Sequence, residues 1–277
     1  MTPKISAVLG KGGAGKTLVA AHLAMAFDYL GAKTLLIGCD QKQDTLRAVS
    51  GDARGSLMEG LEQSGFDYAK IAPERVVVPV TQYVDALELG PSQLLVGHYA
   101  SVFDEAFHYF KMHGLLERYR QVIFDVTDER WDAALAPLFR RAHSAVAVTR
   151  ETPESLFVVN RLLRAAQIGA VEFHHPMALV GLINNRSRDP VAFERYIERT
   201  HAFPLLTIPD TQELAGLRPF HRTLFALKPR VAALERLHTG FIKIAELLRG
   251  DPLNLYSVSS LEDDEIWKLA PPVRLPS

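Results

Sequence analysis

Residues 10–17 read Gly-Lys-Gly-Gly-Ala-Gly-Lys-Thr. They follow the apolar run Ile5–Leu9, which predicts a strand, and precede Leu18–Leu30, which predicts a helix. A glycine loop between a strand and a helix is the setting of a phosphate-binding loop, because its backbone N–H groups can approach a polyphosphate and the helix N-terminus adds partial positive charge. The backbone groups expected to hold the phosphates belong to Gly12, Gly13, Ala14 and Gly15.

The last two residues of this stretch indicate which ligand the loop takes. Gly10–Gly15 also satisfies G-x-G-x-x-G, and Asp40 ends the next strand where the ribose-binding acid of a dinucleotide site would lie. Lys16 and Thr17 favour a nucleoside triphosphate instead, since a lysine can reach the outer phosphates and a threonine hydroxyl can bind Mg²⁺. A dinucleotide has little use for either side chain.

Carboxylates follow two further predicted strands. Asp40 and Asp44 come after the apolar run Lys33–Gly38, at the edge where open α/β sheets bind ligands. We expect Asp40 to orient or deprotonate the attacking water and Asp44 to sense the γ-phosphate and Mg²⁺; the alternative is a solvated turn with Asp44 as a helix cap. Asp125 ends the strand Gln121–Asp125 and would hold Mg²⁺ together with Thr17. A strand-ending aspartate is common, so this assignment depends on the phosphate loop.

The remaining pattern predicts an α/β fold with a mostly parallel sheet and helices on both faces, because the apolar strands lack polar alternation. We expect one P-loop NTPase domain over residues 1–250 and an acidic, proline-containing tail over 251–277 that wraps the core or a partner. The other predicted strands are Val76–Val80, Tyr83–Leu89, Ala145–Thr149, Ala178–Ile183 and Leu205–Pro209, and the other long helices are Pro153–Ala166 and Arg230–Arg249.

Composition narrows the class of protein. The net charge of −1 does not suggest nucleic acid or an anionic membrane as a partner. A single cysteine provides no disulfide framework and no cysteine-rich metal site within one chain. The N-terminus leaves no room for a signal peptide, and no apolar run reaches the ~18 residues of a membrane-spanning helix. A cytoplasmic, reduced protein is expected.

Lys11 is a second lysine inside the loop, which an ordinary phosphate-binding loop does not require. One interpretation is an exposed loop charge. The form K-G-G-x-G-K-T also resembles the deviant Walker A loop of a dimeric ATPase class. That class includes the nitrogenase iron protein, the iron proteins of the dark protochlorophyllide reductases, and the plasmid-partition, septum-site, arsenite and tail-anchored-protein ATPases. The resemblance implies a homodimer with ATP and Mg²⁺ between its subunits, in which Lys11 reaches the partner's phosphates and acts in catalysis with Lys16.

Two further stretches carry the resemblance. Ile37–Thr45 looks like the switch I sequence G-C-D-P-K-x-D-(S/T) of the iron proteins, with Gln41 in place of Pro. Gly181–Asn185 looks like their G-L-I-C-N segment, which implies that Asn185 contacts the adenine, with Asp210 as a weaker candidate for the base. The resemblance is therefore to the iron proteins rather than to the partition ATPases.

The resemblance fails where the iron proteins bind their [4Fe–4S] cluster. They share it across the dimer through two cysteines per subunit. This chain has His98 at the first position and Thr127–Ala133 where the second lies, with Asp128 as a candidate for the switch II aspartate. No cluster is expected. His98 and Trp131 would mark the former cluster face, and the stripe Phe103, Phe107 and Phe110 is expected to be core or a partner groove.

The sequence thus predicts a Mg-ATP-hydrolysing homodimeric switch without a cluster, whose nucleotide state controls docking to an unknown partner protein in metalloenzyme assembly or regulation. One alternative is a partition or positioning ATPase, which needs a basic surface patch that the composition does not suggest. Another is a nucleotide-dependent binding module that does not hydrolyse ATP, motivated by the altered switch II region.

Overall fold

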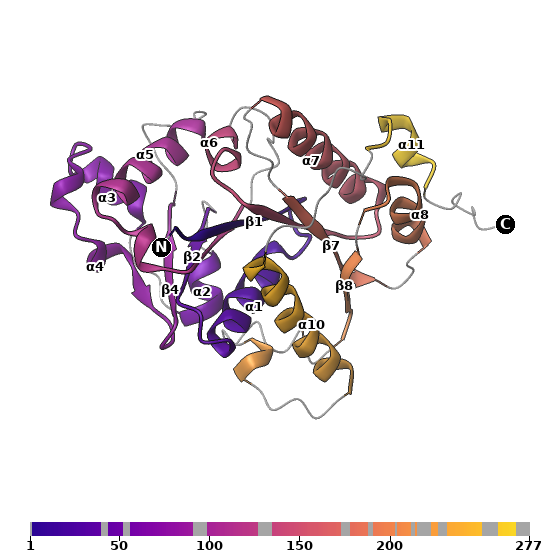
Figure 1. The fold of residues 1–277 in the computed structure, drawn as a ribbon, viewed down its shortest axis with the longest axis horizontal. Helices are drawn as coiled ribbons and strands as arrows, with labels where there is room; N and C mark the ends of the chain where they lie inside the picture. The colour runs from indigo at the N-terminus through magenta and orange to yellow at the C-terminus, as the bar shows by residue number, and fades with distance from the viewer. Residues whose placement is uncertain are drawn as a thin grey trace.

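The computed structural model describes residues 2–39, 44–51, 56–90, 99–126, 135–172, 178–187, 191–202, 204–211, 214, 223–226, 232–250 and 260–269. Within these residues the chain forms an eight-stranded sheet in the order β3-β4-β2-β5-β1-β6-β7-β8 (Figure 1). β3 pairs antiparallel with β4, and every other pairing is parallel. The strands are β1 (Lys4–Gly10), β2 (Thr34–Gly38), β3 (Val78–Pro79), β4 (Val84–Glu88), β5 (Gln121–Asp125), β6 (Ser144–Thr149), β7 (Ala178–Ser187) and β8 (Pro204–Pro209).

Helices cover both faces of the sheet, and each face has its own apolar core. One face is covered by α3 (Leu57–Gln63), α4 (Pro73–Val76), α5 (Tyr99–Met112), α6 (Ala136–Phe139), α7 (Pro153–Glu172), α8 (Val191–Thr200) and α11 (Asp263–Trp267), with the short 3₁₀ turns η1 (Tyr68–Lys70) and η2 (Leu116–Arg118). The other is covered by α1 (Lys16–Tyr29), α2 (Asp44–Ser50), α10 (Ala232–Arg249) and the 3₁₀ turn η4 (Leu224–Ala226). The expected α/β fold is confirmed.

The helix after the glycine loop, α1, is apolar on nearly all sides. Its residues from Val19 to Phe27 are buried, because the helix lies between the sheet and α10. Gly31, with φ of 64°, ends it by taking the left-handed conformation that glycine adopts without strain. The helix is therefore held firmly behind the loop that precedes it.

The predicted elements lie close to the observed ones, with informative differences. β5 has the expected bounds, and the aromatic stripe of α5 is buried, with Phe107 packed against Phe124 of β5 at a ring-centroid distance of 5.7 Å. The strand expected at Val76–Val80 shrinks to β3, because Val76 ends the short helix α4. β7 runs on to Ser187 because it pairs with β8, so Asn185 lies in a strand and not after it.

Part of the acidic C-terminal stretch is ordered against the domain. Residues 260–269 pack beside α7 and α8, and Leu261, Ile266 and Leu269 are buried in the core of that face (Figure 1). No described helix is long and apolar enough to cross a membrane.

Candidate nucleotide-binding site

The glycine loop leaves the carboxyl end of β1, which lies between β5 and β6 in the middle of the sheet. At Gly10 a Cβ atom would lie 2.1 Å from the carbonyl oxygen of Val148 in β6, so only glycine lets the two strands approach this closely. Gly15 has φ of 97° and forms the N-cap of α1. The two glycines thus fix where the loop starts and how it turns into the helix.

The loop is closed by its own backbone, with a lysine held across it. The N–H of Ala14 donates to the carbonyl of Lys11 at 3.0 Å. The Nζ atom of Lys16 donates to the same carbonyl at 3.0 Å, and Lys16 is only 5% exposed. The first turn of α1 contains no acidic residue. A cation and the N-terminal amides of a helix therefore meet in this loop, an arrangement that suits a polyphosphate.

The junction between β6 and α7 lies beside the loop, because Gly10 pairs with Val148 at the end of β6. Ser155 donates its N–H to the hydroxyl of Thr152 at 3.3 Å, so Thr152 caps α7. Hydrogen bonds from its own backbone N–H and from the Thr152 hydroxyl lower the pKa of Glu154, and the positive charge of Lys11 lowers it further. Glu154 was not among the residues predicted for the site, although an acid in the first turn of a helix is a recognisable pattern.

Asp125 is the buried acid of the site. It is fully buried at the end of β5, level with Val8 of β1. Its Oδ2 accepts a hydrogen bond of 2.8 Å from the hydroxyl of Thr45, which directly follows Asp44 at the start of α2. The expected pair Asp44 and Asp125 is thus brought to the same edge of the sheet, with Asp44 exposed and Asp125 inside.

A second buried carboxylate positions α2. The Oε1 of Glu88, at the end of β4, accepts the N–H of Leu46 at 2.6 Å. A Cβ at Gly38 would lie 2.0 Å from Oε2 of Glu88 and 2.7 Å from the Cβ of Thr45, so this glycine admits both. Sequence reasoning missed Glu88 and the contact made by Thr45. The available signal was that the predicted strand Tyr83–Leu89 contains two acids, Asp85 and Glu88, among apolar residues.

The residues expected near the base lie at the carboxyl ends of β7 and β8. Asn185 pairs with Ile208, and Asp210 follows β8 directly and is exposed. Gly12, Gly13, Thr17 and Lys11 occupy the loop and first turn as expected. Asp40 lies outside the described residues. So do His98, Asp128 and Trp131. Among the described residues, no cluster of three or more His, Cys, Asp or Glu side chains could hold a metal ion.

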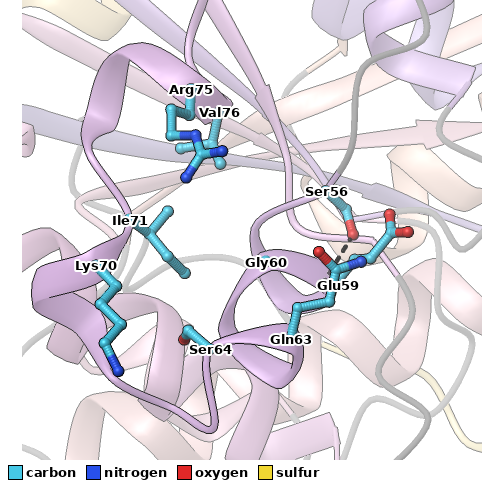
Figure 2. Close-up of a pocket in the computed structure, with 9 residues that line it drawn as sticks. All are labelled: Ser56, Glu59, Gly60, Gln63, Ser64, Lys70, Ile71, Arg75 and Val76. Atoms are coloured by element: carbon cyan, nitrogen blue, oxygen red, sulfur yellow. Dashed lines mark hydrogen bonds between the residues drawn. The ribbon is translucent and has the colours of Figure 1, made fainter.

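A separate cavity of ~440 Å³ is lined by residues of α3, η1 and α4 and their flanking positions (Figure 2). Figure 2 shows Ile71 and Arg75 pointing toward the space between α3 and the segment that follows it. No residue of the glycine loop lines this cavity, so it is distinct from the phosphate site. Its lining residues are Ser56, Glu59, Gly60, Gln63, Ser64, Lys70, Ile71, Arg75 and Val76.

The fold is similar to the folds of several solved structures. It is similar to an ATP complex of a Cyanothece McdA variant, with a TM-score of 0.68 at 16% identity, covering 88% of this chain and 96% of that one. It is also similar to the cell division protein MinD of Aquifex aeolicus, with a TM-score of 0.63 at 18% identity, covering 91% of this chain and 98% of that one. The fold is that of the MinD- and ParA-like P-loop ATPases.

Sequence comparison then defines the family. The model of the 4Fe-4S iron sulfur cluster binding proteins, NifH/frxC family, matches residues 4–264, and the chain belongs to this family. It is 32% identical over 268 residues to the light-independent protochlorophyllide reductase iron-sulfur ATP-binding protein of Halorhodospira halophila, covering 96% of this chain and 87% of that protein. The corresponding protein of Jannaschia sp. is 30% identical, with 96% and 86% covered.

The family name implies a [4Fe–4S] cluster, and the thiols of this chain do not fit one. Such clusters are held by four cysteine thiolates. The chain has one cysteine, Cys39, so two copies supply two thiols. Cys39 follows β2, its N–H donates to the carbonyl of Asp125 at 3.0 Å, and its side chain packs against the apolar core. The only thiol is therefore a packed residue beside the predicted switch.

Proposed function

We propose that this protein is a Mg-ATP-binding and ATP-hydrolysing homodimeric switch that works without an iron–sulfur cluster. The observation that carries the proposal is the geometry of the glycine loop. The buried ammonium of Lys16 donates to the carbonyl of Lys11, and the buried Asp125 ends β5, the strand next to β1 in the sheet. This arrangement combines a polyphosphate cradle with an acid suited to a Mg²⁺ ion. Family membership and the P-loop fold support it.

Each predicted residue has a role in this proposal. The amides of Gly12–Gly15 and the ammonium of Lys16 bind the phosphates. Thr17, Asp44 and Asp125 hold Mg²⁺ directly or through water, with Thr45 keeping the Asp125 carboxylate in place. In this proposal the phosphate and metal residues come from the carboxyl ends of β1, β5 and β2, which are neighbours in the sheet.

The remaining roles concern hydrolysis and the base. Asp40 orients the attacking water. Lys11 crosses to the partner subunit's nucleotide and stabilises charge that develops on the transferred phosphate. Asn185 and Asp210 border the adenine.

The output of the switch is a change in protein docking. Hydrolysis would reset a dimer closed by ATP, and a partner protein would read the difference. Two similar solved structures support docking and nucleotide binding: a MinC:MinD complex of Aquifex aeolicus and a MinD–Mg-ADP complex of Pyrococcus horikoshii. Since those chains are at most 22% identical to this one, they do not favour a partition or septum-site role here. The single cysteine favours a reduced, cytoplasmic setting.

The test is ATP turnover with Mg²⁺, measured alongside the oligomeric state with ATP, with ADP and without nucleotide. Lys11→Ala should lower turnover by about 10³-fold while ATP still binds, because the in-trans charge is lost. Asp40→Asn should also slow turnover and leave ATP binding intact. Lys70→Ala, an exposed lysine at the separate cavity, is the matched control and should change neither.

The outcome separates the proposal from its main alternative. Turnover with an ATP-strengthened dimer, slowed in both Lys11→Ala and Asp40→Asn, supports the switch. Tight ATP binding with no turnover and no effect of Asp40→Asn would contradict hydrolysis, and the protein would then be a nucleotide-dependent binding module.

A further inference from the structure

The strongest unexplained feature outside the nucleotide site is how α7 and α8 hold residues 260–269, here called the C-terminal segment. We propose that the α7–α8 surface, made by Asn160, Arg164, Arg195, Tyr196 and Arg199, is an exchangeable docking site for an acidic peptide. The C-terminal segment is its resident occupant, and an acidic segment of a partner protein with the same pattern replaces it. This inference does not depend on ATP hydrolysis.

The first argument is that the Asn160 side chain forms hydrogen bonds with the backbone of the C-terminal segment. Asn160 is fully buried, and its Nδ2 donates to the carbonyl of Leu261 at 2.8 Å. Its Oδ1 accepts the N–H of Leu261 at 2.8 Å and the hydroxyl of Tyr196 at 3.4 Å. A side-chain amide that pairs with both the N–H and the C=O of one residue recognises an extended backbone rather than a particular side chain. Any extended peptide can make these two bonds.

The second argument is charge complementarity. Arg164 pairs with Glu262 at 3.4 Å and with Asp263 at 3.1 Å, and Arg199 pairs with Glu265. Three acidic side chains of the segment thus face two arginines, one from each helix. The surface therefore selects an acidic occupant.

The third argument is the spacing of apolar anchors. Leu261, Ile266 and Leu269 are buried in the core of this face, and Arg195 donates to the carbonyl of Leu269 at 3.3 Å. A peptide that fits this surface therefore has a leucine at the position of Leu261, followed by one acidic helical turn whose isoleucine, Ile266, is buried against the core. Trp267 remains 51% exposed at the edge, 6.4 Å from the ring of Phe157, so a longer partner could cover more apolar surface than the segment does.

The resident occupant is held in a way that permits exchange. The side chains of Glu262 and Asp263 are 81% and 54% exposed, and exposed ion pairs contribute little to stability. α11 has five residues, too few to persist as a helix away from the surface. The segment contributes no strand to the described sheet, so its departure leaves the pairing of the described strands unchanged. A competing peptide has only to replace local contacts.

The test uses the full chain and a fluorescein-labelled peptide of residues 260–269, followed by fluorescence anisotropy without nucleotide. Ile266→Asp removes an anchor of the resident segment and leaves the α7–α8 surface intact. This variant should bind the wild-type peptide at least about tenfold more tightly than the wild-type chain does, because the tethered competitor is weakened. Glu246→Arg on α10, on the opposite face of the sheet, is the control and should behave as wild type.

A charge exchange tests the recognition itself. Arg199→Glu, added to Ile266→Asp, should weaken binding of the wild-type peptide by about threefold to tenfold, and a peptide with Glu265→Arg should recover the loss. If circular dichroism shows that Ile266→Asp does not fold, Glu265→Arg in the chain serves as the released variant, since the Glu265 side chain is 32% exposed and a positive charge there would repel Arg199. Absence of saturable binding to a folded released variant would overturn the proposal. Equal affinity for the wild-type and released chains would also overturn it, because the peptide would then bind elsewhere.

Discussion

Acid should destabilise this protein through one side chain, His22 of α1. The imidazole is buried and stacks on Phe241 of α10, with ring centroids 5.0 Å apart. Its Nδ1 lies 2.7 Å from the carbonyl of Leu18, and its Nε2 accepts the N–H of Leu224 at 3.1 Å. The neutral ring with its hydrogen on Nδ1 satisfies both contacts. A second proton, on Nε2, would face the N–H of Leu224 and break the link between α1 and η4.

The size of the effect follows from the pKa of this group. Burial lowers the pKa of His22 from 6.5 to about 4, against the opposing effect of the hydrogen bond to Leu18. The unfolded chain binds a proton below pH 6.5 and the folded chain does not until near pH 4, so stability is complete above 6.5 and falls as the pH drops. The whole shift corresponds to about 3 kcal/mol. About 2 kcal/mol of this is already lost at about pH 5.

The assay is urea unfolding at about pH 7.5 and about pH 5, comparing wild type with His22→Gln. Glutamine cannot take up the proton, so the wild type should lose about 2 kcal/mol more than this variant between the two conditions. His108→Gln, at an exposed position on α5, is the control for the His-to-Gln replacement itself.

Two results would refute this reasoning. One is an equal loss of stability in wild type and His22→Gln, within about 0.5 kcal/mol. The other is an NMR titration of the His22 ring in the folded protein with a midpoint near its ordinary value. Either would mean that water reaches the ring or that η4 moves aside when the ring is charged.

Three further predictions concern the glycine loop, the buried Asp125 and the end of α10. Gly10→Ala should cost several kcal/mol of stability or prevent folding, because the added Cβ would meet the backbone of Val148. Gly13→Ala has open space but a φ of 74°, and it should cost only about 1 kcal/mol. Equal thermal unfolding temperatures for the two variants would contradict the close approach of β1 and β6. Thr45→Val should cost about 1.5 to 3 kcal/mol by removing a hydrogen bond to the buried Asp125, and Thr45→Ser should largely preserve stability, as measured by denaturant unfolding. Lys4→Met should lower the free energy of unfolding by about 0.5 to 1 kcal/mol, because the Lys4 ammonium caps the last carbonyls of α10. Amide hydrogen exchange at that helix end should become faster, and unchanged exchange there would count against the cap.

The sequence by itself determined the strand, loop and helix around residues 10–17, because every signal for that unit lies within one short stretch. It also determined β5, whose apolar run ends in an acid with no ambiguity of bounds. The helical spacing of Phe103, Phe107 and Phe110 predicted one apolar face, as core or as a partner groove, and the structure places that face in the core.

The ends of some strands and short helices could not be predicted from the sequence. Asn185 lies in β7 because pairing with β8 extends that strand, which no single segment reveals. Val76 joined a short helix because Pro73 at its first turn favours helix over strand there.

Only the tertiary structure decided which distant groups meet. Thr45 and Asp125 are 80 residues apart, Asn160 and Leu261 are 101 apart, and His22 and Leu224 are 202 apart. Each pair is a specific hydrogen bond inside a packed region, and its partners are set by strand order and helix placement rather than by local pattern. The sequence therefore predicted the chemistry of the phosphate loop, while the packing alone decided what holds Asp125, α1 and the C-terminal segment in place.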